Sequence, residues 1–505
     1  LILDGTPLVS DGVILRVELD DGSGPRELAR QVLRRADAWV SWRVPLPDVT
    51  GQVRLVLRAD PGPFGSQDAD YALWSDLRLL GEPTRAPEHP HVVLLDVDTL
   101  RADHLGLYGY ERDTSPRLDA WARDHALVFE RALSTNSWTL PATASLLTGL
   151  TVAQHGVWSF PGRLEAEHES LALRMARAGY ETRAATEGGF VIPSFGFAHG
   201  FDVFDLSVNH VKVPERDAWL DLRRDLAERR SERPLFCFLQ TYEVHDPYVE
   251  DGRFRDPSRP PFDQRATTGI RRDPGLRFVR VEREGLSPED LADVRDWYDA
   301  AVFRMDARVG ELLEALPGLF GDEPYVVLIT SDHGEELGER GQVGHAHGLH
   351  GELLHVPLLL AAPGLEAGRV DTRVSLIDVV PTLLAAAGLP VSAELVGRSL
   401  LDAPQERAQV AALTPGTEAL VADDVKLMTE SPEDGGQVRL FDLASDPEER
   451  HDLADQRPAD VARLVDLLRA RRGEGVLQAA GDAGFGLDPA TVENLRALGY
   501  LGEDL

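Results

Sequence analysis

The chain has 505 residues, a formal net charge of −33 and 43% hydrophobic residues, a globular composition with room for more than one domain. The negative charge argues against nucleic acid or an anionic membrane surface as a partner. No run of about 18 apolar residues is present, so we expect no transmembrane segment. The first residue is Leu1 and not Met. A removed signal peptide and a truncated sequence both explain this, so the compartment is unknown, with a periplasmic or secreted location favoured.

Residues 1–86 show short alternating runs that are typical of β-strands. Val13–Leu19, Trp39–Leu46 and Val53–Arg58 alternate, with Gly, Asp and Pro between them. Many short strands without long helices predict a small β-sandwich domain. The segment loosely resembles carbohydrate-binding sandwich modules. Its tryptophans, including Trp74, are nevertheless more typical of a core than of a sugar-stacking surface.

In residues 87–505, short continuous apolar runs alternate with helical periodicity, which is typical of a parallel sheet covered on both faces. Three runs lead into polar side chains: Val92–Val97 into Asp98, Leu235–Leu239 into Thr241 and His245, and Tyr325–Thr330 into Asp332 and His333. Because open α/β sheets bind ligands at the carboxyl ends of their strands, we expect these groups at one edge. We interpret Asp96, on the first strand, as structural.

A short helix is predicted within Ser137–Gly149. Pro141 suits a first helical turn and Gly149 can end the helix. Thr139 then lies at the positive N-terminal end, where an anion and a deprotonated nucleophile are both favoured. Taken alone, Thr139 would be interpreted as a helix N-cap.

Four side chains offer oxygen and imidazole ligands for one divalent metal ion: Asp98, Thr139, Asp332 and His333. A threonine hydroxyl is barely nucleophilic at neutral pH, and a bound cation can hold it as the alkoxide. The same cation can withdraw charge from a phosphoryl or sulfuryl oxygen. We expect His245 and His345 to bind the remaining substrate oxygens or to protonate the leaving group.

The chain from His91 onward resembles the sulfatase branch of the alkaline phosphatase superfamily. The matching stretches, in the family's order, are Leu94–Gly106, Thr139–Gly149, His155–Val157, His245–Tyr248, Ser331–Glu335, Gly344–His347, Val374–Leu384, Leu440–Arg450 and Leu495–Gly502. The resemblance implies an α/β fold, an alkaline-phosphatase-like α/β/α sandwich over residues 87–505. A small C-terminal subdomain is expected from about residue 365 to residue 505.

The chain departs from the formylglycine sulfatases. Thr139 stands where they carry Cys or Ser, and threonine cannot become formylglycine. Thr143 replaces their arginine, and Asp98-Thr99 replaces their paired aspartates. Ala184–Gly189 lacks the usual lysine, and His345 falls where many members place another lysine.

A threonine nucleophile resembles the superfamily's phosphonate monoester hydrolases, nucleotide phosphodiesterases and lipoteichoic-acid-type phosphoglycerol transferases. His333 in place of asparagine favours Mn or Zn, with Ca as an alternative. Dinuclear members have an Asp four residues before a His. Here Thr241 precedes His245, so a second metal ion is doubtful, with Glu243 as the substitute considered.

The other polar residues have structural interpretations: His155 as a packed histidine, His347 and His350 as loop or ligand-supporting residues, Asp103 as a cap, and Cys237 as a buried small hydrophobe. Helices are expected over 164–178, 295–315, Asp378–Gly388 and 458–472, and a strand over Val438–Leu443. The stripe Trp297, Ala301, Met305, Val309 and Leu312 should be core. The insertion Gly252–Arg283 has nine arginines against four acidic residues, and a solvated loop is favoured over an anion-binding lid.

These patterns favour a metal-dependent hydrolase that cleaves a phosphoester, phosphodiester or phosphonate ester by attack of Thr139. The substrate would be a small anionic ester or a glycan-linked ester. The alternatives are a sulfate ester hydrolase without formylglycine, a transferase of phospho-alcohol groups onto a glycan, and a non-catalytic glycan-binding protein. The oligomeric state does not follow from the sequence.

Overall fold

The computed structural model describes residues 2–3, 6–7, 13–33, 44–47, 49, 52–61, 89–206, 218–227, 233–259, 270–272, 278–281, 285–403, 405–430 and 436–473. The chain divides into two compact units. One is Leu1–Pro83 with Asp202–Asp205, and the other is Thr84–Phe201 with Leu206–Leu505. Within the described ranges, no helix has the length and apolar character needed to cross a membrane.

The N-terminal unit contains a three-stranded antiparallel sheet. Its central strand, β3 (Val13–Asp20), pairs with β4 (Arg26–Leu33) and β5 (Arg54–Pro61), and a two-stranded pair is formed by β1 (Ile2–Leu3) and β2 (Thr6–Pro7). The strands predicted at Val13 and Val53 are confirmed, whereas β4 lacks clear alternation and was not predicted. Trp39, Trp42 and Trp74 lie outside the described residues, so the sandwich stays a prediction.

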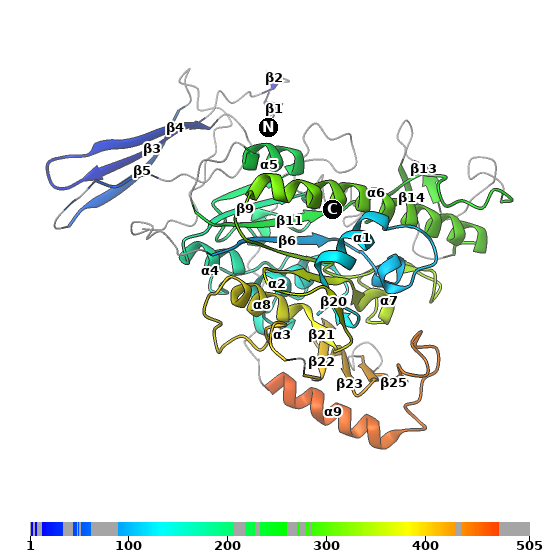
Figure 1. Ribbon diagram of the computed structural model, residues 1–505. Helices are drawn as coiled ribbons and strands as arrows, with labels where there is room; N and C mark the ends of the chain where they lie inside the picture. Colours follow the sequence, from blue (N-terminus) through cyan, green and yellow to red (C-terminus); the bar gives the residue numbers. More distant parts are fainter. Residues whose placement is uncertain are drawn as a thin grey trace. The chain divides into compact units, whose positions relative to one another are not determined.

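The large sheet has eight strands in the order β10-β9-β11-β6-β15-β19-β7-β20 (Figure 1), and every strand except β10 lies wholly within the second unit. These strands are β6 (His91–Val97), β7 (Leu127–Phe129), β9 (Glu181–Thr186), β10 (Val203–Leu206), β11 (Leu235–Thr241), β15 (Tyr325–Thr330), β19 (Leu358–Ala361) and β20 (Gly368–Val370). Central β6 is buried throughout and runs parallel to both β11 and β15. The register sets Asp96 level with Gln240 and Thr330, so the three predicted strands end together.

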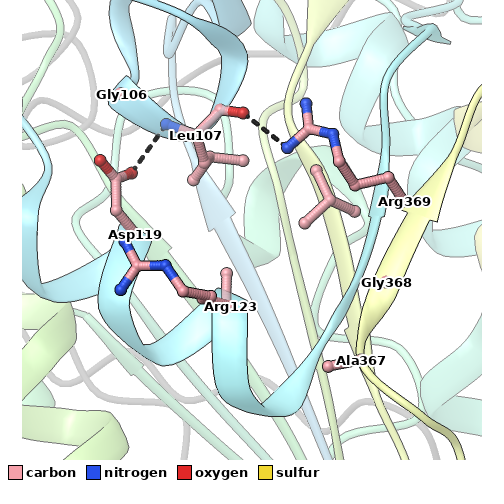
Figure 2. Close-up of a pocket in the computed structure, with 9 residues that line it drawn as sticks. Gly106, Leu107, Asp119, Arg123, Ala367, Gly368 and Arg369 are labelled. Carbon is pink, nitrogen blue, oxygen red and sulfur yellow. Dashed lines mark hydrogen bonds between the residues drawn. The ribbon is translucent and has the colours of Figure 1, made fainter.

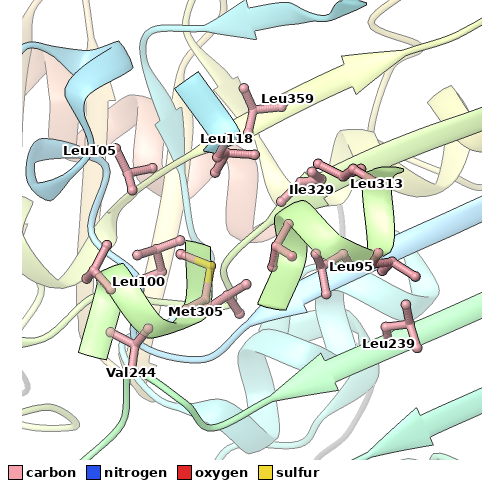
Figure 3. Close-up of a cluster of buried hydrophobic side chains, with 14 of the residues drawn as sticks. Leu95, Leu100, Leu105, Leu118, Leu239, Val244, Met305, Leu313, Ile329 and Leu359 are labelled. Atoms are coloured by element: carbon pink, nitrogen blue, oxygen red, sulfur yellow. The ribbon is translucent and has the colours of Figure 1, made fainter. Parts of the chain in front are cut away.

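Helices cover both faces of this sheet, which confirms the predicted α/β/α layering (Figure 1). One layer contains α1 (Pro116–His125), α5 (Ala218–Ala227) and α6 (Pro288–Phe320), and the other contains α2 (Thr139–Thr148), α3 (Val152–His155), α4 (Leu171–Arg177) and α8 (Val379–Ala386). On the α6 side, Leu95, Leu239 and Ile329 of the sheet pack with Met305 and Leu313 (Figure 3). The predicted core stripe of α6 is confirmed, and Cys237 is buried in the same core, which raises the pKa of its thiol to about 12.

Two helix predictions differ from the structure. The helix expected over 164–178 is only α4, because the Ser170 side chain accepts the Leu173 N–H and starts the helix there. The helix expected over 295–315 is longer, since Ser287 and Asp290 form a reciprocal cap and Pro288 occupies the first turn.

A smaller antiparallel sheet forms near the C-terminus from β22 (Gln409–Thr414), β23 (Thr417–Ala422), β24 (Val425–Thr429) and β25 (Val438–Asp442), and α9 (Pro458–Gly473) packs on it. β20 and α8, which follow residue 365, belong with the large sheet. The remaining elements are η1 (Ala102–His104), η2 (Gly106–Tyr108), β8 (Ala132–Leu133), η3 (Pro193–Phe195), β12 (Tyr248–Val249), β13 (Ile270–Arg272), β14 (Phe278–Val281), β16 (Glu336–Leu337), β17 (Val343–Gly344), α7 (Gly351–Leu354), β18 (His355–Val356), β21 (Val374–Ser375) and η5 (Leu376–Asp378).

Candidate active site

Four predicted side chains meet beyond the carboxyl ends of β6 and β15. Asp98 follows β6, Asp332 and His333 follow β15, and Thr139 begins α2. The Thr139 hydroxyl donates to Asp98 Oδ2 over 3.1 Å and lies 3.3 Å from His333 Nε2. Ligand atoms of the two aspartates and the histidine lie within 4.8 Å of one another. The structure therefore brings together the residues predicted to hold a metal ion, and their roles stay predictions.

The nucleophile candidate is placed by the predicted helix. Thr139 is the first residue of α2, and Trp138 with extended backbone is the residue before the helix, so Thr139 is not an N-cap. Gly149 ends the helix with φ 72° and donates its N–H to Ser145 O over 2.8 Å. A Cβ on Gly149 would also lie 3.0 Å from Val380 Cβ, which makes glycine the favoured residue there. Every residue of α2 is buried, so Thr139 has little freedom to move.

Three carboxyl groups are buried close to one another in this region. Asp96, Asp98 and Asp332 have no exposed surface. Burial and mutual repulsion raise the pKa of Asp98 and Asp96 well above the usual value, and burial raises the pKa of Asp332. In the described part of the chain, the one ion-pair partner of Asp98 and Asp332 is His333. Buried carboxylates of this kind are neutralised by a proton or by a cation, and a divalent cation would fit this charge pattern.

The orientation of the ligand atoms also fits a cation. Asp98 Oδ1 and Asp332 Oδ2 are buried without a hydrogen-bond partner among the described residues. His333 Nδ1 lies 2.8 Å from Gly334 O, so Nδ1 carries the proton and donates it, and Nε2 keeps its lone pair for a ligand. Both oxygens of Asp96 likewise lack a partner among the described residues. The structural role expected for Asp96 stays a prediction.

The backbone beside Asp98 is strained and held from α6. Thr99 adopts φ 58°, which is rare for a β-branched residue. Tyr298 of α6 donates its hydroxyl to Thr99 O over 2.7 Å and accepts the Arg101 N–H over 2.9 Å. Ser331 accepts the Leu100 N–H over 2.9 Å. Strain of this kind collects at functional sites, where surrounding contacts fix the conformation.

His245 and His345 lie beside Asp98, Asp332 and His333, the three candidate metal ligands that we call the metal-ligand group. The His345 ring centroid is 4.6 Å from that of His333 and 4.9 Å from that of His245. His245 Nδ1 contacts Asp246 O, and burial together with His345 lowers the pKa of His245 to about 3. His345 Nδ1 lies 3.0 Å from Glu335 Oε1. The two imidazoles thus form one row of rings with His333.

A family model described as Sulfatase matches residues 90–389, more than half of the chain. The chain belongs to the sulfatase family. Arylsulfatase K of Bos taurus is 32% identical over 206 residues, covering 37% of this chain and 38% of the relative. Choline-sulfatase of Rhizobium meliloti is 25% identical over 442 residues, covering 76% of this chain and 83% of the relative. The match thus spans little more than a third of the length of the arylsulfatase K proteins.

Solved structures confirm the alkaline-phosphatase-like fold. The phosphonate monoester hydrolase of Agrobacterium radiobacter superposes with a TM-score of 0.63 at 22% identity, covering 76% of this chain and 96% of that one. BT1596, a 2-O GAG sulfatase, superposes with a TM-score of 0.59 at 19% identity, covering 76% and 93%. At these identities the likeness concerns the fold alone.

Three positions singled out in the sequence, one in the nucleophile helix and two in the question of a second metal ion, have defined surroundings. Thr143 is fully buried on α2. Thr241 donates its hydroxyl to Glu187 Oε2 over 2.8 Å. Glu243, considered for a second metal ion, pairs with Arg304 over 2.9 Å, so its carboxylate is already engaged.

The histidine interpretations agree with the structure. His155 is buried, and its Nε2 lies 3.0 Å from Ser145 Oγ while its Nδ1 accepts the Val157 N–H over 3.1 Å. Burial lowers the pKa of His155 to about 3. His347 contacts Glu336 over 2.9 Å and the backbone oxygen of His345 over 3.0 Å, and His350 contacts Glu449 over 2.7 Å.

Two other predictions need correction. Asp103 caps no helix: both of its oxygens accept from Arg101, over 2.9 and 2.7 Å, and this pair lowers the pKa of Asp103 well below the usual value. The arginines of the insertion are not all solvated. Arg259 is only 15% exposed and pairs with Asp293 over 2.9 Å and with Asp296 on α6. The interpretation failed because the sequence does not show that α6 presents buried carboxylates to this loop.

A cavity of about 310 Å³ lies between α1, β7 and β20, apart from the metal-ligand group (Figure 2). Two of the charged side chains that line it form hydrogen bonds with the backbone of Leu107. Arg369 donates to Leu107 O over 2.9 Å, and Asp119 accepts the Leu107 N–H over 3.1 Å. None of the predicted site residues lines it.

Proposed function

We propose that this protein is a metal-dependent ester hydrolase in which Thr139 attacks the phosphorus atom of a phosphodiester or phosphonate monoester. The observation that carries the proposal is the Thr139 hydroxyl, 3.1 Å from Asp98 and 3.3 Å from His333 in a fully buried ligand group. Membership of the sulfatase family supports ester hydrolysis, and threonine in place of a formylglycine precursor supports phosphorus over sulfur.

Asp98, Asp332 and His333 would hold one divalent cation, and Thr139 would complete the set. When bound, the cation supplies positive charge that lowers the pKa of the threonine hydroxyl and stabilises the anionic substrate. Asp98 already accepts the Thr139 hydroxyl proton in a hydrogen bond, so the Oγ lone pairs are oriented away from it. Imidazole and carboxylate ligands together suit Mn or Zn.

The reaction has two balanced steps. Thr139 Oγ gives up its proton and forms a bond to phosphorus, the bond from phosphorus to the leaving alcohol oxygen breaks, and that alcohol takes up one proton in place of the one that Thr139 lost. A water oxygen then forms a bond to the phosphorus of the threonine ester and the bond from phosphorus to Thr139 Oγ breaks, while one water proton returns to Oγ and restores the hydroxyl. His245 and His345 lie beside His333 and would contact the anion or transfer these protons.

A sulfate ester hydrolase is the second candidate, because the family and the choline-sulfatase relative favour it. The same ligand group and Thr139 would serve attack on sulfur. A screen that separates the two uses bis-aryl phosphate, aryl phosphonate and aryl sulfate esters of one phenol, with the metal content measured in the same sample. We expect one metal ion per chain and a preference for the phosphorus esters. Preference for the sulfate ester would replace this proposal by the second.

Thr139→Ala and Thr139→Ser test the nucleophile. Removal of a residue that forms the covalent bond costs several orders of magnitude in kcat, whereas serine keeps the hydroxyl and should retain measurable turnover. Unchanged turnover in Thr139→Ala with normal metal content would refute the proposal. Thr148→Ala on the same helix is the matched control, since its hydroxyl bonds Ala144 O at the far end.

A further inference from the structure

A buried carboxylate links the insertion to an active-site histidine. Glu335 is fully buried two residues after His333. Its Oε1 lies 3.0 Å from His345 Nδ1, and its Oε2 accepts the hydroxyl proton of Tyr248, which is 1% exposed. Arg101 donates to the backbone oxygen of Glu335 over 3.0 Å. Each oxygen of this carboxylate therefore has one defined partner, and one of the two is the histidine.

Tyr248 is itself held by the chain around the insertion. It lies on β12, which pairs with β14 through Tyr248 and Val279, and β14 pairs with β13. Between β12 and β13, Arg259 pairs with Asp293 and Asp296 of α6, and the Arg253 guanidinium lies 3.9 Å from the centre of the Phe303 ring. Arg253 and Arg259 of the insertion thus contact α6, and the small sheet that follows fixes the backbone of Tyr248.

We propose that Glu335 is a positioning residue for His345, and that the insertion acts through Tyr248 to hold Glu335 in place. The inference rests on the proposed function, because it assigns His345 to the reacting ester. It gives the insertion a role in supporting the site.

The physical reason lies in the two nitrogens of imidazole. A carboxylate that accepts a hydrogen bond from Nδ1 fixes the proton on that nitrogen and fixes the plane of the ring. The lone pair of Nε2 then points in one direction. His245 and His333 are oriented through Nδ1 in the same way, by backbone oxygens of Asp246 and Gly334. For His345 the orienting group is a side chain, which can be changed without changing the backbone. The Tyr248 hydroxyl, which donates to the second oxygen of Glu335, then limits rotation of that carboxylate.

A double-mutant cycle distinguishes positioning from a structural effect. Glu335→Gln should lower kcat about 10- to 100-fold with little change in KM, the usual loss when an orienting partner is removed. His345→Ala should lower kcat at least as much. If Glu335 acts through His345, Glu335→Gln should change kcat less than about threefold in the His345→Ala background. Additive losses would overturn the proposal.

The insertion's part in the proposal is tested by Tyr248→Phe, which keeps the ring and removes the hydroxyl. It should give a smaller loss than Glu335→Gln and no further loss when the two are combined. Glu336→Gln is the matched control, because Glu336 contacts His347, and His347 contacts the backbone oxygen of His345 and not its ring. An equal loss in Glu336→Gln would show that any disturbance of this loop lowers kcat, and would overturn the assignment.

A second measurement does not depend on turnover. In metal-loaded protein with ¹⁵N-labelled histidine, NMR should show His345 with its proton on Nδ1, and this signature should change in Glu335→Gln while that of His155 stays. An unchanged His345 signature would refute the positioning role. A changed signature without ester turnover in the wild type would support the positioning and refute the proposed function, so the two failures are distinguishable.

Discussion

Gly334, between the metal-ligand candidate His333 and Glu335, offers a sharp perturbation of the site geometry. A Cβ there would lie 3.1 Å from the carbonyl carbon of Glu352 and 3.3 Å from Arg101 Cγ, and inside 3.0 Å of the Glu352 carbonyl oxygen. Real Cβ atoms essentially never approach closer than 3.0 Å. In Gly334→Ala the backbone at residue 334 must therefore move by about 1 Å. This movement would disrupt the hydrogen bond in which the N–H of residue 334 donates to Leu353 O, 2.8 Å long in the native chain.

A displacement of about 1 Å in the residue after His333 should cost on the order of 10² in kcat, and overpacking should cost about 1–3 kcal/mol of unfolding free energy. The assay is steady-state hydrolysis of the preferred aryl ester, with metal content and urea unfolding measured in parallel. Gly348→Ala is the matched control, since its Cβ would make an ordinary contact 3.5 Å from Leu353 Cδ1. Wild-type kcat and metal content in Gly334→Ala would refute the geometric argument.

Two further predictions concern charge. Burial raises the pKa of Asp98 and Asp332 above about 3.9, the value for an unfolded chain, so the metal-free fold binds protons more tightly and loses stability as pH rises. A bound Mn²⁺ ion would replace those protons, so the increase in Tm on adding Mn²⁺ should grow as pH rises above about 4 and should vanish in Asp332→Asn; a gain independent of pH would contradict this. Arg259→Gln removes the ion pairs of Arg259 with Asp293 and Asp296 and should cost about 3 kcal/mol in urea unfolding; a loss below about 1 kcal/mol would show that the pairs are not structural.

The positions of the ligand candidates followed from the sequence because each is adjacent to a strongly patterned element. Two continuous apolar strands place Asp98, Asp332 and His333 at one edge of the sheet. Helix α2, with a proline in its first turn and a glycine after its last residue, places Thr139 at the same edge. Parallel pairing makes these ends meet without any knowledge of side-chain contacts. Burial of the α6 stripe was predictable for the same reason, since helical period alone decides it.

The contacts that orient the site were not predictable in this way. The left-handed backbone of Thr99 runs against the preference of a β-branched residue, and the hydroxyl of Tyr298 that holds it belongs to a helix we interpreted only as core. Tyr248 and Glu335 are 87 residues apart, so no local pattern links them. Asp103 looked like a cap because the sequence does not show that Arg101 lies beside it.

The central claim is that Thr139 forms a covalent bond to the substrate. The most direct measurement is acid quench of the metal-loaded protein during turnover of a bis-aryl phosphate, followed by peptide mass spectrometry. The account predicts an added aryl phosphoryl group on Thr139, formed as fast as the first equivalent of phenol is released, and absent from Thr139→Ala. Full turnover with no adduct at Thr139, or an adduct on another residue, would contradict it.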